Sequence, residues 1–181
     1  VLTGSPITDL RITLVSGKAH LKHTEGGDFR QATYRAVRQG LRKAQSVLLE
    51  PWYSFRLELP SGMLGRAMTD FERMHAELSA PELTGERAVL TGAGPVRLLR
   101  GCTAEVTSYT RGQGKISYQP AGYRPCAQQD EIVKRIGYDP ERDLLHPTGS
   151  VFCSHGAGFE VKWDEVDRMA HLPLLDFSPK Q

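Results

Sequence analysis

Asparagine is absent from this sequence, and cysteine is scarce, with three residues among 181. Without asparagine there is no acceptor site for N-linked glycosylation. The cysteines are odd in number and too widely separated for a disulfide framework: Cys102, Cys126 and Cys153. This use of cysteine is typical of a reducing compartment, and we expect a cytoplasmic protein.

Long apolar runs are also missing from the chain. No segment approaches the roughly 20 consecutive apolar residues that a membrane helix requires. Residues 1–5 lack the basic and then apolar pattern of a signal peptide. We therefore expect no membrane partner. The sequence starts without Met, which we interpret as the start of a piece cut from a longer protein.

The sequence lacks the usual motifs for nucleotides and metals. No glycine-rich loop ends in Gly-Lys-Ser or Gly-Lys-Thr, and Gly92-Ala93-Gly94 is best explained as a turn. The candidate metal ligands are separated by long, irregular gaps and include no C-x-x-C pair: Cys126, His146, Cys153 and His155. We expect neither a metal nor a cofactor in this chain.

Cys153-Ser154-His155 is the segment that most resembles a catalytic site. Residues two apart on an extended chain point to the same side, so the imidazole can approach the sulfur. The simpler interpretation is a buried cysteine in an apolar strand, followed by a histidine in a turn. We favour this interpretation and predict no catalytic residue, and a small α+β enzyme using Cys153 and His155 is the alternative.

Charge is distributed unevenly, although the formal net charge is only +2. Residues 1–48 contain eight Lys and Arg against three acidic residues, whereas residues 127–181 contain six against ten. We expect the basic N-terminal part to contact a polyanion and the acidic tail not to do so. Ordinary solvated helix faces are the alternative explanation.

Residues 1–48 predict a strand, an exposed loop and a basic amphipathic helix. Leu10, Ile12 and Leu14 alternate with polar residues, which indicates a half-buried strand over residues 9–15. Asp28 is the expected N-cap of a helix that continues to about residue 44. Exposed loops on a rigid scaffold often carry binding residues, and here the expected RNA-binding residues are Lys18, His20, Lys22, His23 and Arg30. An ordinary polar connector is the alternative.

Residues 49–126 predict an α+β domain with the order βαββαβ. The expected strands are residues 52–59, 77–81, 86–92 and 115–119, and the expected helices are residues 61–74 and 95–109. Two helices on one face of an antiparallel sheet form a ferredoxin-like domain. Arg111 and Lys115 flank the last turn and are further candidates for RNA binding. In residues 127–181 we expect helical turns at 130–136 and 163–169.

Three passages resemble the elongation factor G family of translational GTPases, in the same order along the chain. The first resembles a fourth-domain passage, and it reads Gly4-Ser5-Pro6-Ile7-Thr8-Asp9-Leu10-Arg11-Ile12-Thr13-Leu14, then Ser16-Gly17-Lys18-Ala19-His20. The second resembles the junction of the fourth and fifth domains, closest to the tetracycline ribosomal-protection branch, and it reads Val47-Leu48-Leu49-Glu50-Pro51 with Ser54-Phe55. The third resembles a turn of the fifth domain: Tyr109-Thr110-Arg111-Gly112-Gln113-Gly114.

This resemblance implies a domain plan and a partner. Residues 1–48 would be the C-terminal half of a ribosomal-protein-S5-like fourth domain, whose tip enters the decoding region of the small ribosomal subunit. Residues 49–126 would be the fifth domain, against large-subunit rRNA at the GTPase-associated centre, and residues 127–181 an extension. The domain that binds GTP and Mg would precede this chain. The implied partner is the ribosome, with no DNA and no membrane.

The sequence of the loop tip is compatible with two kinds of parent protein. Leu21-Lys22-His23 stands where protection proteins carry a Ser-Pro-Val-like tip, so the parent protein is either a tetracycline-protection factor or a translocation factor. A protein–protein module without an RNA role is a further alternative for the sheet domain. Salt-dependent binding to ribosomes would distinguish a protection or translocation factor from a protein–protein module.

Overall fold

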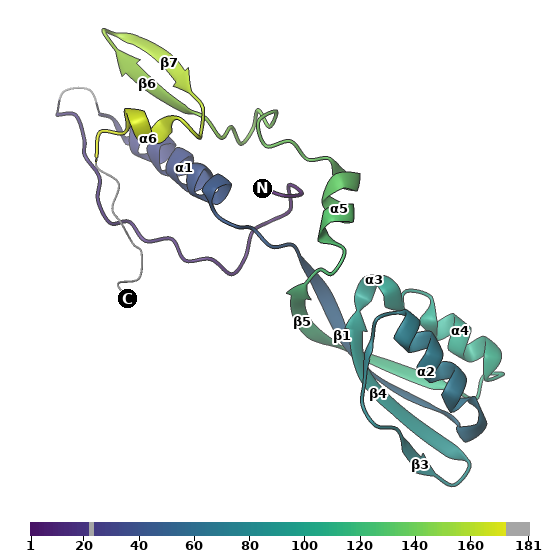
Figure 1. The fold of residues 1–181 in the computed structure, drawn as a ribbon. Helices are drawn as coiled ribbons and strands as arrows, with labels where there is room; N and C mark the ends of the chain where they lie inside the picture. The colour runs from purple at the N-terminus through teal and green to yellow at the C-terminus, as the bar shows by residue number, and fades with distance from the viewer. Residues whose placement is uncertain (22–23, 173–181) are drawn as a thin grey trace, which may run out of the picture. The chain divides into compact units, whose positions relative to one another are not determined.

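The computed structural model describes residues 1–21 and 24–172, which form two compact units (Figure 1). One unit combines Val1–Ser46 with Gln128–Gln181, and the other is Val47–Ala127. Every helix in the described part of the chain is too short or too polar to cross a membrane. Both units contain helices and antiparallel strands, so the α+β class is as predicted.

The unit Val47–Ala127 is built on an antiparallel sheet (Figure 1). Its central strand, β1 (Leu49–Pro60), pairs with β4 (Arg87–Pro95) on one side and β5 (Lys115–Pro125) on the other. The far edge of β4 pairs with two short strands, β2 (Glu77–Leu78) and β3 (Glu82–Thr84). The spatial order is therefore β2-β4-β1-β5, with β3 beside β4.

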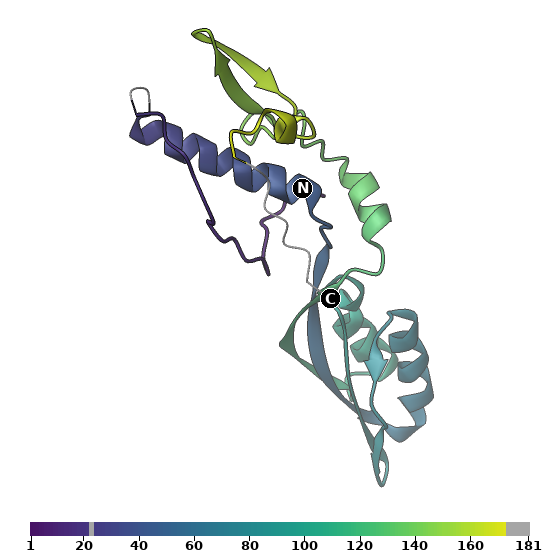
Figure 2. The same cartoon turned by 60° about the vertical axis from the view of Figure 1, so that its left-hand side comes forward.

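Helices cover one face of this sheet, as Figure 2 shows. They are η1 (Ser61–Met63), α2 (Leu64–Arg73), α3 (Val96–Leu99) and α4 (Cys102–Tyr109). The single helix predicted over residues 95–109 is interrupted. Arg100 is extended and Gly101 has a left-handed φ of 85°, a conformation that glycine adopts without steric cost and that ends α3 before α4 begins.

The core of this unit follows from the alternation along β1. Phe55, Leu57 and Leu59 all point toward the helices and are at most 4% exposed. Phe55 stacks on Phe71 of α2 with ring centroids 4.2 Å apart. Complete burial of one such side chain contributes about 1.5–3 kcal/mol to stability, so this stripe fixes which face of the strand is covered.

The junction motif at residues 47–51 contains a partly buried ion pair. Glu50 is 9% exposed, and its Oε2 lies 3.5 Å from Nε of Arg97 at the start of α3. The pairing register shifts between Pro51 and Tyr53, where proline has no N–H to donate. The motif thus joins the first strand to the helix that follows β4.

In the other unit, the main element is the basic helix α1 (Gly26–Lys43). It begins earlier than predicted, because its N-cap is Glu25 and not Asp28. The Asp28 carboxylate instead accepts a hydrogen bond of 2.9 Å from the backbone amide of Glu25. Asp28 therefore occupies the third position of the helix, where a carboxylate satisfies an amide that the helix leaves unpaired.

The strand predicted over residues 9–15 is not formed in the structure. Ile12 and Leu14 are 63% and 90% exposed, and Asp9 has a left-handed φ of 54°. A strand needs a neighbour for its N–H and C=O groups, and none of residues 1–21 and 24–172 pairs with this segment. The alternation is suited to a sheet that the described residues do not supply.

The tail contains α5 (Gln129–Ile136), β6 (Ser150–Ser154), β7 (Ala157–Val161) and α6 (Val166–Met169). β6 and β7 form a hairpin that the sequence analysis did not anticipate. Its turn residues, His155 and Gly156, have φ values of 51° and 81°, as a type I′ turn requires. Cys153 is exposed on this hairpin, so the expectation of a buried cysteine was wrong. A two-stranded hairpin leaves side chains uncovered unless another layer packs on them.

Candidate nucleic-acid interface

The segment that leads into α1 presents polar side chains to solvent. Lys18 and His20 are exposed, and Leu21 is fully exposed at 101%. The backbone amide of His20 donates a hydrogen bond of 2.8 Å to the Thr24 hydroxyl, which links the two sides of the loop just before the helix. Lys22 and His23, also predicted to bind RNA, lie outside the described residues.

Arg30 lies in the N-terminal part of α1 and is exposed. Among residues 1–21 and 24–172, neither Arg30 nor Lys18 forms an ion pair. Their charges are therefore available to a ligand in solution. Exposed Lys and Arg side chains of this kind bind phosphate oxygens and release counterions from nucleic acid.

The other cations of α1 have a different environment. Arg35 donates a hydrogen bond of 2.6 Å to the carbonyl of Gly149, and Arg38 donates one of 3.5 Å to the carbonyl of Pro147. Arg42 and Lys43 pair with the carboxylates of Glu141 and Asp167, respectively. The C-terminal extension, residues 127–181, thus supplies acceptors for all four side chains. From the sequence, we expected these cations to contact a polyanion.

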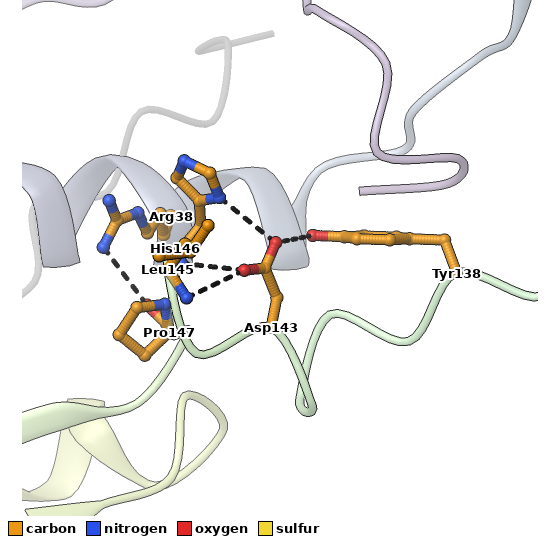
Figure 3. Close-up of polar contacts among 6 residues, drawn as sticks. All are labelled: Arg38, Tyr138, Asp143, Leu145, His146 and Pro147. Atoms are coloured by element: carbon orange, nitrogen blue, oxygen red, sulfur yellow. Dashed lines mark hydrogen bonds and ion pairs between the residues drawn. The ribbon is translucent and has the colours of Figure 1, made fainter.

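The part of the extension that reaches Arg38 is shaped by one aspartate, shown in Figure 3. Asp143 accepts hydrogen bonds from the Tyr138 hydroxyl at 2.8 Å and from the backbone amides of Leu145 and His146 at 3.0 and 2.9 Å. The His146 ring nitrogen Nδ1 lies 3.2 Å from the same carboxylate. The Tyr138 hydroxyl, followed by the His146 amide, lowers the pKa of Asp143 to about 2.

The second group of predicted residues lies on the turn between α4 and β5. The buried Thr110 hydroxyl donates a hydrogen bond of 2.6 Å to the carbonyl of Val106 and accepts one of 2.9 Å from the amide of Gly114. Arg111 and Gly112 between them have φ values of 54° and 79°. The threonine therefore closes a tight loop that directs an arginine outward.

Arg111 and Lys115 are both exposed at this turn. Lys115 also lines a shallow depression of about 490 Å³ over α4 and the neighbouring strands, together with Thr103, Thr107 and Arg56. Arg56 forms an ion pair of 3.2 Å with Glu58. The hydroxyl and cationic groups of this depression are suited to an anionic or strongly hydrated partner.

The predicted residues thus form two groups, one in each unit. Lys18, His20 and Arg30 flank the loop before α1, and Arg111 and Lys115 flank the turn before β5. Sequence reasoning missed the contacts of Arg35 and Arg42 with the extension. The signal was present in the opposite charges of residues 1–48 and 127–181, which were interpreted separately.

Cys153 and His155 lie at the tip of the β6–β7 hairpin, and both are exposed. Cys153 pairs across the hairpin with Gly158, and His155 occupies the turn itself. In residues 1–21 and 24–172, no group of three or more His, Cys, Asp or Glu side chains is arranged to hold a metal ion. The other two cysteines, Cys102 and Cys126, are buried, and burial raises the pKa of the Cys102 thiol.

Comparison with known protein families gives two matches, which together cover most of the chain. Residues 1–45 match the family model of elongation factor G, domain IV. Residues 47–132 match the family model of the elongation factor G C-terminus. The two matches are adjacent along the chain, and the match to domain IV comes first.

Similar proteins include both branches of this family. The tetracycline resistance protein TetP of Clostridium perfringens is 32% identical over 154 residues, which is 83% of this chain and 24% of that protein. TetO of Campylobacter coli is 30% identical over 69% of this chain and 20% of its own length. Elongation factor G 2 of Streptomyces coelicolor is 30% identical over 67% of this chain and 18% of its own length. The chain thus spans about a fifth to a quarter of these relatives.

A solved structure also shares the fold of part of the chain. The crystal structure of ttk003000868 from Thermus thermophilus superposes with a TM-score of 0.51 and 20% sequence identity. It covers 54% of this chain and 15% of that protein. At this identity the similarity concerns the fold alone.

Proposed function

The chain belongs to the family of elongation factor G and the tetracycline resistance proteins, and we propose that it is the ribosome-binding C-terminal region of a translational GTPase. The observation that carries this proposal is the pair of adjacent matches to domain IV and to the C-terminus of elongation factor G. These are non-catalytic parts of a GTPase. We propose that the GTP and Mg sites belong to a domain outside this chain, in a cytoplasmic protein.

The domain plan that we propose has three segments. Residues 1–48 form the end of a ribosomal-protein-S5-like domain IV, residues 49–126 a ferredoxin-like domain V, and residues 127–181 an extension. The strand order β2-β4-β1-β5 with helices on one face supports the ferredoxin-like assignment. The exposed, unpaired segment around Leu14 supports the view that residues 1–48 are part of a larger domain.

The proposed contacts with rRNA follow from exposure and charge. Lys18, His20, Lys22, His23 and Arg30 would bind RNA in the decoding region of the small subunit. Arg111 and Lys115 would bind large-subunit rRNA near the GTPase-associated centre. Exposed Lys18, Arg30 and Arg111 support this assignment, because RNA backbones are contacted chiefly by accessible cations.

Within the family we favour a tetracycline ribosomal-protection-like protein, with an elongation factor G-like translocation factor as the second candidate. The observation that favours protection is the similarity to TetP over 154 residues, whereas TetO matches over 125 residues and the elongation factor G 2 proteins of Streptomyces coelicolor and Desulfotalea psychrophila over 122 and 137. Expression in a tetracycline-sensitive strain separates the candidates, because only a protection protein raises the drug concentration that the cells tolerate.

The experiment that tests ribosome binding is a salt titration with the full-length protein. Replacing Lys18 and Arg30 by glutamine should weaken binding to purified ribosomes and flatten the plot of log affinity against log salt. Each lost phosphate contact reduces the slope by about 0.7–0.9. The matched control replaces Lys134 of α5 and Arg100, two exposed cations outside the proposed groups, and should keep the wild-type slope.

Two outcomes would contradict the proposal. If the wild-type protein shows no salt-dependent binding to ribosomes, the assignment to this function is wrong. If binding is salt-dependent but both double variants behave alike, the protein binds ribosomes through other residues.

A further inference from the structure

The cations of α1 that face the C-terminal extension lie on one side of the helix. Arg35, Arg38, Gln39, Arg42 and Lys43 follow the spacing of neighbours on a helical surface. Arg35, Arg38, Gln39 and Arg42 are partly buried, whereas Arg30 near the N-terminus of the helix is exposed. The polar contacts between α1 and the extension among the described residues thus come from the C-terminal half of the helix.

Three segments of the extension contact this side of α1: Glu141, residues 147–149 and residues 163–167. The stretch before β6 offers the carbonyls of Pro147 and Gly149 to Arg38 and Arg35. Gln39 donates hydrogen bonds of 3.2 Å to the carbonyl of Trp163 and 2.9 Å to the carboxylate of Asp167. Asp167 also pairs with Lys43, which lowers the pKa of its carboxyl.

Arg42 is more enclosed than Lys43, with 20% of its side chain exposed against 39%. Its guanidinium lies 4.6 Å from the ring centroid of Trp163 and 3.2 Å from the Glu141 carboxylate. The indole N–H of Trp163 donates to the same Glu141 oxygen at 3.3 Å. Arg42, Glu141 and Trp163 thus contact one another, while the buried Nε of Arg42 has no hydrogen-bond partner among the described residues. A cation stacked on an aromatic face is held more firmly than an exposed ion pair.

The acceptors on the extension are the kind that RNA would otherwise supply. Carboxylate and carbonyl oxygens of the extension form hydrogen bonds and ion pairs with the same guanidinium and ammonium groups that would bind phosphate oxygens. The charges match as well, since residues 1–48 carry an excess of basic residues and residues 127–181 an excess of acidic ones. Two carboxylates of the tail, Glu141 and Asp167, and two of its backbone carbonyls thus occupy the cations of this part of the helix.

We propose that the C-terminal extension is an intramolecular cover for α1, which occupies the cationic side of the helix and prevents it from binding RNA phosphates. Among the described cations of α1 and of the loop before it, Lys18 and Arg30 then remain available to RNA. The inference goes beyond ribosome binding and does not depend on it, because it concerns any RNA that meets the protein.

The test compares two charge-matched variants of the full-length protein. The first, Glu141→Gln with Asp167→Asn, removes the two carboxylates that pair with Arg42 and Lys43. The control, Asp130→Asn with Glu131→Gln, removes two exposed carboxylates of α5 and changes the net charge equally. Binding to a short RNA duplex of arbitrary sequence is measured over a range of salt concentrations, and amide hydrogen exchange is measured across α1 without RNA.

We expect the first variant to bind the duplex about tenfold more tightly than the control at low salt. Its salt dependence should be steeper by about one to two phosphate contacts. Amides of α1 should exchange faster in the first variant only. Unchanged exchange in α1 would overturn the proposal, and so would faster exchange without any gain in RNA binding over the control.

A second pair of variants covers the case in which the first does not fold. Lys43→Asp alone places like charges opposite each other and should loosen α1. Lys43→Asp combined with Asp167→Lys restores an opposite-charge pair and should return exchange in α1 toward that of the wild type. Equal exchange in the single and combined variants would overturn the proposal, because the pair of Lys43 with Asp167 would then not hold the extension on α1.

Discussion

The amide of Gly114 donates a hydrogen bond of 2.9 Å to the buried hydroxyl of Thr110, across the turn that joins α4 to β5. The same hydroxyl donates to the carbonyl of Val106, so threonine satisfies a helix end and a turn at once. Gly114 comes so close that a methyl group there would lie 2.7 Å from Val106 Cγ1 and 2.8 Å from Thr110 Oγ1. Glycine is therefore required at position 114 of this turn because no space is left for a side chain.

We predict that Gly114→Ala destabilises the sheet unit by about 1–3 kcal/mol, because the added methyl group displaces buried neighbours. The matched control is Gly65→Ala in α2, where a Cβ meets nothing within 4 Å. That substitution should stabilise the protein by about 0.5–1 kcal/mol through helix propensity. Urea unfolding of both variants measures the free energies, and equal stability of the two would contradict this account of the turn.

The sheet unit was predictable from sequence because its signals are local. Phe55, Leu57 and Leu59 alternate on β1, and that period determines both the strand and its buried face. The break between α3 and α4 was missed, because a glycine within a helical pattern does not reveal a left-handed φ such as the 85° of Gly101. The strand expected around Ile12 failed for another reason. Alternating apolar residues indicate that a segment can form a strand in a sheet. Whether a neighbouring strand is present to pair with it depends on other parts of the protein.

The candidate site was predictable only in part. Exposed cations such as Lys18 and Arg111 were recognised from composition and from the resemblance to elongation factor G. The contact of Arg35 with Gly149 joins residues 114 positions apart, and no local pattern reveals such a pair. Opposite charge in two distant segments indicates attraction between them only after they are considered together.

The Asp143 cluster gives the extension a defined pH dependence. The pKa of this carboxyl is lowered from 3.8 to about 2, so its contribution to stability is present above about pH 4 and is lost as the pH falls toward 2. We predict that Asp143→Asn lowers the unfolding temperature at neutral pH. The difference from the wild type should shrink between about pH 4 and pH 2, as thermal melts at several pH values would measure.

A second variant identifies the physical cause of this effect. Tyr138→Phe removes the hydroxyl that contributes most to the lowered pKa of Asp143, so that pKa should rise from about 2 toward 3.8. Titration of the carboxyl carbon by NMR measures it directly. Tyr123→Phe serves as the control, since Tyr123 is 70% exposed on the sheet unit. An unchanged Asp143 pKa in Tyr138→Phe would assign the shift to the backbone amides instead.

The final prediction concerns the alternative in which Cys153 is a nucleophile. The structure places Cys153 in the open on β6, and a substitution at an exposed position usually changes stability by no more than about 0.5 kcal/mol. We therefore expect Cys153→Ser to keep both the stability of the chain and the ribosome-stimulated GTP hydrolysis of the full-length protein. His155→Asn should behave alike, because asparagine tolerates the left-handed backbone of that turn.

Cys102→Ser provides the contrast for these two variants. Cys102 is 2% exposed in the core of the sheet unit, and replacing its buried thiol by a hydroxyl should cost about 1–3 kcal/mol, measured by urea unfolding. A nucleophile, in contrast, is required for turnover and not for stability, since it forms the covalent bond to the substrate. If Cys153→Ser abolished hydrolysis while the protein unfolded at the wild-type urea concentration, Cys153 would take part in catalysis and the non-catalytic assignment of this chain would be wrong.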